Sequence, residues 1–172
     1  GDVTIDGTLG AGTYTITPNV SGLLATNYTF TPATGTLTVG KKVVTVTADP
    51  QAMTYGAATL PTESVTYSGF ANGDTESVVT GTVGYGYFDG ATSVTRSSTL
   101  DAGSYTITPV VTGLTADNYV FTPDSGLLIV APRAILIAAD VSEKNFGDAD
   151  PAFTYAILTG DIGGTTYYSI LA

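Results

Sequence analysis

The sequence predicts a mainly β protein, α+β at most, built from small antiparallel or mixed sheet units in tandem. Three observations lead to this prediction. Apolar and hydroxyl side chains alternate over short stretches, Gly, Pro, Asn and Asp recur between those stretches, and a long segment of the chain is repeated. An alternation of period two is the pattern of a half-buried strand, and closely spaced turn residues are typical of antiparallel sheets.

The alternation is clearest where Tyr105 and Ile107 alternate with threonines, and it recurs at Tyr14 and Ile16. Threonine has a branched Cβ that favours extended backbone, and its hydroxyl keeps the exposed face hydrated without charge. The same reasoning predicts further strands at residues 43–47, 64–67, 83–88, 119–122 and 127–130.

One segment departs from the strand pattern. Asp74 or Thr75 is placed to act as an N-cap, and Glu76 follows in the first turn, where the helix dipole favours an acid. We therefore predict a short helix at residues 75–79. Two architectures fit one short helix with several strands: a grasp-like sheet crossed by the helix, or an Ig-like β-sandwich of two thin sheets.

The chain repeats itself at an offset of 91 residues. Residues 3–39 align without a gap on residues 94–130, and 23 of the 37 pairs are identical. This period is longer than the roughly 20 to 50 residues of solenoid repeats, so the repeated units are predicted to be whole small domains in series.

The basic pair at Lys41 lies between two strand-like stretches and marks the start of a unit. We predict one complete unit at residues 41–131, with the C-terminal half of a unit at residues 1–40 and the N-terminal half of another at residues 132–172. The two halves are complementary, so we expect them to pair between molecules, either reciprocally in a swapped dimer or head to tail in a filament.

An alternative division is two permuted units, at residues 1–88 and 89–172. Because Gly1 is not an initiator methionine, we also expect the sequence to be part of a longer protein.

The composition excludes several classes of function. Five Lys and Arg against fifteen Asp and Glu give a net charge of -10, which would repel a phosphate backbone, so nucleic acid is not expected as a partner. The chain has no His and no Cys, which removes thiolate catalysis, disulfides and the commonest metal ligands. We predict neither enzymatic activity nor a cofactor. No apolar run approaches the roughly 20 residues of a membrane span, so no membrane insertion is expected in this segment.

The segment ADVSEKNFGDADPAFTY at residues 139–155 resembles the opening of the MBG-type repeat, which occurs in tandem in large bacterial surface adhesins. Four further blocks follow the order of that family, at residues 47–56, 67–75, 102–108 and 118–130. The sequence departs from the family pattern at Ala57 and Thr59, which replace two acids, and at Phe146, which replaces a tyrosine.

The resemblance implies a grasp-like fold and an extracellular repeat segment of a bacterial cell-surface adhesin. Such a segment would act as a stalk, a spacer or an adhesive module, with neighbouring repeats of the same chain and a host or environmental glycoprotein or glycan as its partners. Two alternatives stay open: a lectin-like domain that binds glycan or mucin, and an extender made rigid by Ca²⁺.

Four tyrosines outside the repeated skeleton are candidates for stacking on sugar rings: Tyr85, Tyr87, Tyr167 and Tyr168. Exposed aromatic rings would serve a carbohydrate-binding face. Tyr85 and Tyr87 are two residues apart on one predicted strand, so they are equally suited to be core residues or cross-strand neighbours.

Asp148 and Asp150 are the candidate metal ligands, because Ca²⁺ prefers oxygen donors. The alternative is that both acids stabilise a turn, since Asp148 follows a glycine and Asp150 precedes a proline. The aromatic residues that recur with the repeat are predicted to be core: Tyr14, Tyr28, Phe30, Tyr105, Tyr119 and Phe121.

Overall fold

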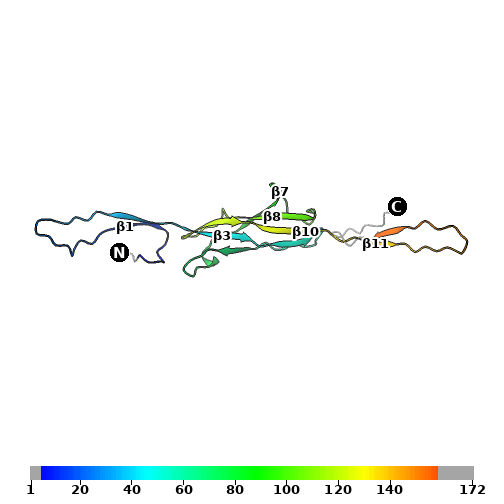
Figure 1. Ribbon diagram of the computed structural model, residues 1–172, viewed down its shortest axis with the longest axis horizontal. Helices are drawn as coiled ribbons and strands as arrows, with labels where there is room; N and C mark the ends of the chain where they lie inside the picture. Colours follow the sequence, from blue (N-terminus) through cyan, green and yellow to red (C-terminus); the bar gives the residue numbers. More distant parts are fainter. Residues whose placement is uncertain (1–4, 159–172) are drawn as a thin grey trace. The chain divides into compact units, whose positions relative to one another are not determined.

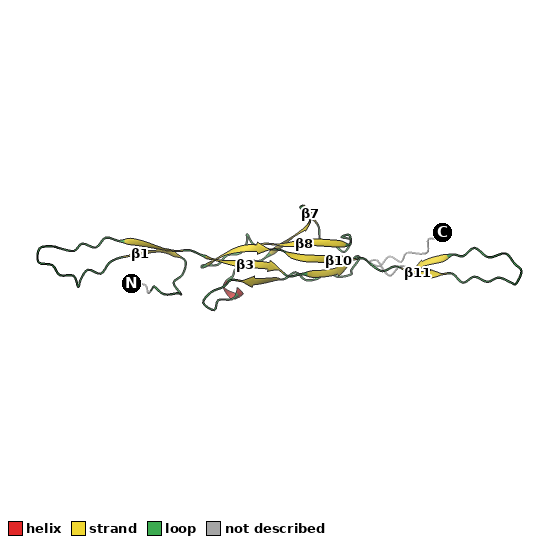
Figure 2. Ribbon diagram, in the orientation of Figure 1, coloured by secondary structure: helices red, strands yellow, loops and turns green. Residues whose placement is uncertain are grey.

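The computed structural model describes residues 5–158 and confirms a mainly β protein with several small antiparallel and mixed sheets (Figures 1 and 2). The chain divides into two compact units. The first contains the chain up to Ala48, together with Val65–Tyr85 and Pro109–Asp124. The second contains Asp49–Ser64, Gly86–Thr108 and the chain from Ser125 onward. Each unit is therefore assembled from segments that lie far apart in the sequence.

The main sheet of the first unit has three strands, in the order β5-β3-β9. Its strands are β3 (Lys42–Ala48), β5 (Val65–Ser68) and β9 (Tyr119–Asp124). The central strand β3 runs antiparallel to β5 and parallel to β9. The sheet is therefore mixed.

The core of this sheet is made by the residues of β3 that point to one face. Val44, Val46 and Ala48 are buried, whereas the threonines between them are half-buried. Val44 forms a buried cluster with Ala116 and Tyr119. Three partly buried aromatic residues pack against this cluster: Tyr67, Phe70 and Phe121. The rings of Phe70 and Tyr119 meet edge to face with their centroids 5.2 Å apart, a favoured aromatic arrangement.

The first unit also holds a two-stranded antiparallel sheet of β1 (Gly12–Ile16) and β2 (Gly35–Val39). Residues 17–34 connect the two strands and contain no strand of their own.

The second unit contains a five-stranded sheet in the order β4-β10-β8-β6-β7. Its strands are β4 (Gln51–Thr54), β6 (Gly84–Asp89), β7 (Thr92–Val94), β8 (Gly103–Val110) and β10 (Gly126–Ala131). Strand β10 is parallel to β4 and antiparallel to β8. The buried residues of the five-stranded sheet are Met53, Tyr87, Tyr105, Ile107, Pro109, Leu128 and Val130.

A separate two-stranded sheet in the second unit pairs β11 (Leu136–Ala139) antiparallel to β12 (Tyr155–Leu158). Within residues 5–158, no helix is long and apolar enough to cross a membrane.

The predicted helix is a single 3₁₀ turn, η1 (Glu76–Val78), with Thr75 as its N-cap. The Thr75 side chain accepts a hydrogen bond from the Ser77 amide at 3.4 Å. Of the two candidate caps, Thr75 is therefore the cap, and Asp74 instead accepts a hydrogen bond from Tyr119. The grasp-like and sandwich arrangements and the predicted domain boundaries stay predictions.

The aromatic skeleton is buried in one copy of the repeat and not in the other. Tyr105 and Tyr119 are core residues, as predicted. Tyr28, the counterpart of Tyr119, is 78% exposed, and Phe30, the counterpart of Phe121, is 44% exposed, so the prediction that these two are core was wrong. Tyr14 and Phe121 are half-buried. Residues 28–33 form no strand, whereas the equivalent residues 119–124 form β9 beside β3.

Candidate functional site

Tyr87 is a packing residue of β6. Its side chain is 7% exposed, and its hydroxyl donates a hydrogen bond to Glu63 Oε1 at 2.9 Å. The same carboxylate oxygen forms an ion pair with Arg96 at 2.7 Å, and the Arg96 guanidinium lies 5.6 Å from the centroid of the Tyr87 ring. Burial and these contacts favour the core interpretation of Tyr87 over sugar stacking. Tyr85, on the same strand, is half-buried.

The remaining tyrosine candidates, Tyr167 and Tyr168, lie outside the described residues. The stacking prediction for them stays a prediction.

Asp148 and Asp150 lie on an exposed turn that closes around Lys144. The ammonium of Lys144 donates to Asp150 Oδ1 at 2.5 Å, and the Asn145 amide donates to Asp148 Oδ2 at 3.3 Å. These contacts support the turn interpretation. Among residues 5–158, no cluster of three or more acidic side chains is arranged to hold a metal ion. A role for Ca²⁺ stays a prediction.

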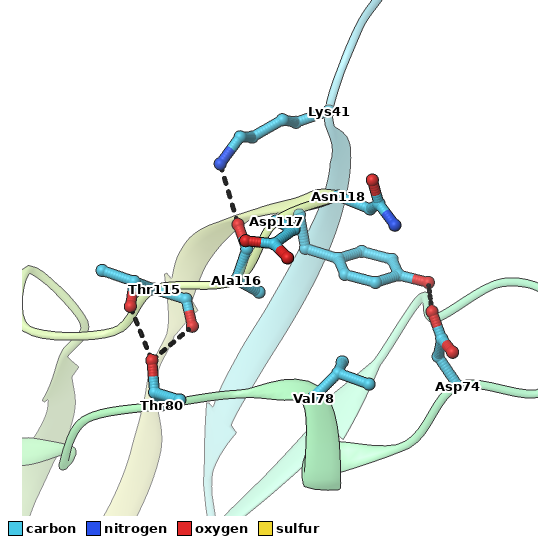
Figure 3. Close-up of a pocket in the computed structure, with 9 residues that line it drawn as sticks. Lys41, Asp74, Val78, Thr80, Thr115, Ala116, Asp117 and Asn118 are labelled. Carbon is cyan, nitrogen blue, oxygen red and sulfur yellow. Dashed lines mark hydrogen bonds between the residues drawn. The ribbon is translucent and has the colours of Figure 1, made fainter. Parts of the chain in front are cut away.

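The first unit contains a polar pocket with a volume of about 420 Å³ (Figure 3). The residues around it come from three segments: the residue before β3, the segment that carries η1, and the segment that leads into β9. They are Lys41, Asp74, Val78, Thr80, Thr115, Ala116, Asp117, Asn118 and Tyr119. Pockets of about 300 to 1,000 Å³ are the usual size of small-molecule sites.

Thr80 and Thr115 fix two of these segments to each other. They form an antiparallel β-bridge in which each amide donates to the carbonyl of the other at 2.9 Å. Their hydroxyl oxygens lie 2.6 Å apart, as the dashed lines in Figure 3 indicate. The next residue, Gly81, has a φ of +103°, and the chain at this point passes directly against the carbonyl oxygen of Gly113.

A second connection forms the opposite wall of the pocket. The buried phenol of Tyr119 donates to Asp74 Oδ2 at 2.7 Å and accepts from the Ala71 amide at 3.1 Å. The hydrogen bond to the Asp74 carboxylate raises the pKa of the Tyr119 phenol, because the bond favours the protonated form. Tyr119 is therefore a neutral hydrogen-bond donor in this wall of the pocket.

Lys41 and Asp117 add two further charged groups to the pocket lining. The ammonium of Lys41 donates to the Ala116 carbonyl at 2.8 Å, and Asp117 is exposed beside it. The side-chain oxygen of Asn118 accepts a hydrogen bond from the Ala11 amide at 2.8 Å. The pocket thus combines an ammonium group, carboxylates, hydroxyls and an amide. This combination suits a ligand rich in hydrogen-bonding groups.

Sequence reasoning did not identify this pocket. It considered Asp74 only as a helix cap and Lys41 only as the start of a repeat unit. The repeated Asn-Tyr pair, Asn118-Tyr119, was a usable signal, since it recurs in the other copy. Thr115 and Asp117 do not recur there, because Leu24 and Thr26 occupy the equivalent positions. The polar lining is therefore specific to this copy.

The comparisons with known proteins identify the repeat. A family model described as the MBG domain of the YGX type matches residues 44–129, which is half of the chain. No curated protein and no solved structure matches the chain. The matched range contains β4 to β9 and most of β3 and β10.

Proposed function

The chain belongs to the MBG domain family of the YGX type, and from this membership we propose that it is an extracellular repeat segment of a bacterial cell-surface adhesin that acts as a stalk. A stalk must hold a binding tip away from the cell while tension is applied along the chain. Resistance to tension depends on how the hydrogen bonds between strands are oriented relative to the pull.

The observation that carries this proposal is the parallel pair β3–β9 in the first unit. Its register runs from Lys42 beside Tyr119 to Thr47 beside Asp124. Tension along the chain pulls β3 toward its N-terminus and β9 toward its C-terminus. Because the strands are parallel, they are pulled in opposite directions along their length, and the hydrogen bonds between them are loaded together.

The second unit repeats this geometry with different strands. There β4 pairs in parallel with β10, from Leu128 beside Gln51 to Ala131 beside Thr54. The chain leaves the central repeat at the C-terminal end of β10, so tension again pulls the two strands past each other. Each of the two compact units therefore contains a parallel strand pair that tension along the chain loads in shear: β3–β9 in the first and β4–β10 in the second.

A single-molecule pulling experiment tests the stalk proposal. The chain has no cysteine, so Gly40→Cys with Pro132→Cys provides two unique handles outside the central repeat. The matched control keeps Gly40→Cys and moves the second handle to Asp117→Cys, next to the start of β9. In the control, β3 and β9 are pulled apart from the same end and their hydrogen bonds break one after another.

We expect the first handle pair to require a clearly higher unfolding force than the control at the same loading rate. Equal forces for the two pairs would overturn the mechanical basis of the proposal.

The polar pocket supports a second candidate function, a lectin-like module that binds glycan or mucin. Its carboxylates, hydroxyls and amide match the hydrogen-bonding groups of a sugar. Titration with mucin, or a glycan array, tests this candidate with Asp117→Ala as the pocket variant and Asp89→Ala as a control with the same change of charge. Saturable binding that Asp117→Ala alone abolishes would support the module. Absence of saturable binding by the unmodified chain would contradict it.

A further inference from the structure

The regions on either side of the central repeat contain strand pairs that match pairs within it. We define the N-terminal flank as residues 5–40, the central repeat as residues 41–131 and the C-terminal flank as residues 132–158. In the N-terminal flank β1 pairs with β2, with Gly12 beside Val39. Ninety-one residues later, Gly103 lies beside Val130 in the equivalent pair β8–β10. The register is the same.

The C-terminal flank matches the other end of the repeat. Strand β11 corresponds to the second half of β3 at the same offset, and it pairs antiparallel with β12 as β3 pairs with β5. Each flank therefore forms one strand pair of the repeat, the pair for which the flank contains both strands.

Two segments of the flanks form no strand, although their equivalents do. Residues 28–33 correspond to β9, and residues 142–145 correspond to β4. In the central repeat β9 depends on β3, and β4 depends on β10. The equivalents of those two partners are β11 and β2, and each lies in the opposite flank. The strands that are missing are therefore those whose partner belongs to the other flank.

The exposed edges agree with this pattern. In the central repeat β3 has two neighbours, β5 and β9, whereas the structure gives β11 only β12 among the described residues. Likewise β10 has two neighbours, β4 and β8, whereas β2 has β1 alone within residues 5–158. A strand with one neighbour presents a row of backbone amides and carbonyls that can pair with another strand.

The side chains show the same division. Val44 and Val46 are fully buried, whereas their equivalents Ile135 and Ile137 are 60% and 61% exposed. In the other flank, Tyr28 is 78% exposed where Tyr119 is 4% exposed. In the central repeat Val44, Ala116 and Tyr119 form one cluster. Its equivalents Ile135, Ala25 and Tyr28 are divided between the two flanks.

We propose that the two flanks are complementary docking surfaces, and that the N-terminal flank of one molecule pairs with the C-terminal flank of a second copy of this chain. Residues 28–33 would pair in parallel with residues 133–138, and residues 142–145 would pair in parallel with residues 37–40, at the end of β2. The register of the central repeat places Arg133 beside Tyr28, Ile135 beside Phe30, Leu136 beside Thr31 and Ile137 beside Pro32.

A second copy fits this role because it carries both complementary segments. Association would bury Ile135, Ile137 and Tyr28, whose exposure is unfavourable in water. Charge does not oppose the pairing, since Asp6 is the single charged residue between residues 5 and 40. The acids of the C-terminal flank therefore meet a nearly uncharged surface.

Disulfide trapping between molecules tests the proposed register. The chain has no cysteine, so Thr31→Cys and Leu136→Cys each introduce one thiol per molecule. They are equivalent to Thr122 and Thr45, which are neighbours in the central sheet. Neighbouring strands lie about 4.8 Å apart, within the range that a disulfide spans. The matched control replaces Thr31→Cys with Thr29→Cys, which is displaced by two residues, about 6.6 Å along the strand.

We expect a mixture of Thr31→Cys and Leu136→Cys molecules to form a disulfide-linked dimer under mild oxidation. The mixture with Thr29→Cys, and each variant alone, should form much less. Equal yields in all five samples, the two mixtures and the three variants alone, would overturn the proposed register.

Light scattering on the unmodified chain provides the second measurement. The mass should rise with concentration from 17.5 kDa to twice that value or higher. A mass of 17.5 kDa at every concentration would overturn the proposal. The double variant Thr31→Cys, Leu136→Cys then shows whether the two flanks pair within one molecule instead, because such pairing would give a disulfide-linked monomer.

A matched pair of substitutions on β11 separates docking from general effects. Ile137→Thr removes an apolar side chain from the proposed interface, whereas Leu136→Thr introduces the residue found at the equivalent Thr45. Ile137→Thr should shift association to higher concentration, and Leu136→Thr should leave it unchanged. If Leu136→Thr weakened association more than Ile137→Thr did, the assignment of Ile137 to the docking face of β11 would be contradicted.

Discussion

The phenol of Tyr119 donates a hydrogen bond to Asp74 Oδ2 at 2.7 Å, which connects the first residue of β9 to the segment before η1. The connection spans 45 residues of sequence. It fixes one wall of the polar pocket and covers the edge of the cluster around Val44. This pair, rather than the cap of η1, should determine how firmly the η1 segment is held.

We predict that Asp74→Ala lowers the urea midpoint of unfolding more than Thr75→Ala does. Asp74→Ala removes the charged acceptor at 2.7 Å from the Tyr119 hydroxyl and leaves only the Ala71 carbonyl at 3.3 Å, and a hydrogen bond to a charged group is stronger than one to a neutral group. Thr75→Ala removes a single capping bond of 3.4 Å and should cost about 0.5 kcal/mol, the low end for an N-cap. Tyrosine fluorescence can follow the unfolding, because the chain has no tryptophan.

The double variant Asp74→Ala, Tyr119→Phe is the control for this prediction. If the two groups act through one hydrogen bond, their effects will not add, and the double variant will be hardly less stable than the worse single variant. Additive effects would mean that Asp74 stabilises the fold in some other way.

The stability of the first unit should fall in alkali because of the same hydrogen bond. The bond to Asp74 raises the pKa of Tyr119, and burial, with Glu76 nearby, raises the pKa of Tyr67. A tyrosine in the unfolded chain has a pKa of about 10. Below that pH both states are protonated and the contribution to stability is complete. Above it the unfolded state loses its proton first, so stability decreases as the pH rises toward the pKa values of the folded state.

Urea midpoints measured from pH 8 upward test this prediction. The unmodified chain should lose stability above about pH 10, and Tyr119→Phe should show a shallower loss because one titrating group is gone. An identical slope in the two proteins would mean that the pKa of Tyr119 is the same in both states.

Alternation along β10 gives a prediction with an internal control. Leu128 is fully buried and Leu127 is 44% exposed. Leu128→Ala should lower the free energy of unfolding by about 2 to 5 kcal/mol, because it leaves a cavity in the core. Leu127→Ala should change it by about 0.5 kcal/mol, as is usual for a surface substitution. If urea titrations give similar losses of unfolding free energy for the two variants, then Leu127 and Leu128 contribute equally to stability and the burial of one face of β10 is not what stabilises the sheet.

Local pattern was sufficient to predict seven of the strands, and strand pairing explains why β4 was not among them. Tyr105 and Ile107 alternate with threonines, and both are buried in β8 as the pattern predicts. Strand β4 has the sequence QAMT, which contains one β-branched residue, so periodicity could not identify it. It forms beside β10, whose paired residues lie 77 positions later in the sequence, as Leu128 lies beside Gln51. A strand of this kind depends on its neighbour more than on its own sequence.

The repeat identified which residues belong to a core but not where that core is complete. Tyr28 and Tyr119 occupy equivalent positions in the repeat. Tyr119 is buried beside β3, whereas Tyr28 is exposed and lies in no strand. The pocket was missed for a related reason. Thr80 and Thr115 are 35 residues apart and Asp74 and Tyr119 are 45 residues apart, and no local spacing shows that such segments meet. Burial of Tyr87 likewise depends on Glu63 and Arg96, which its own strand does not contain.

Gly81, which follows the pocket residue Thr80, should tolerate substitution poorly. Its φ of +103° is in the region that favours glycine, and an added Cβ would lie 2.1 Å from the carbonyl oxygen of Gly113. Relief of that contact requires the backbone to move, which would disrupt the bridge between Thr80 and Thr115. We therefore expect Gly81→Ala to lower the free energy of unfolding by about 2 kcal/mol or more.

Gly40→Ala is the matched control for Gly81→Ala, because a Cβ at Gly40 would meet nothing within 4 Å. Its free energy of unfolding should stay within about 0.5 kcal/mol of the unmodified chain in urea titrations. Since Gly81 also positions Thr80, Gly81→Ala should weaken any ligand binding at the pocket, whereas Gly40→Ala should not. If the two variants unfold at the same urea concentration, the close approach of Gly81 to Gly113 does not constrain the fold.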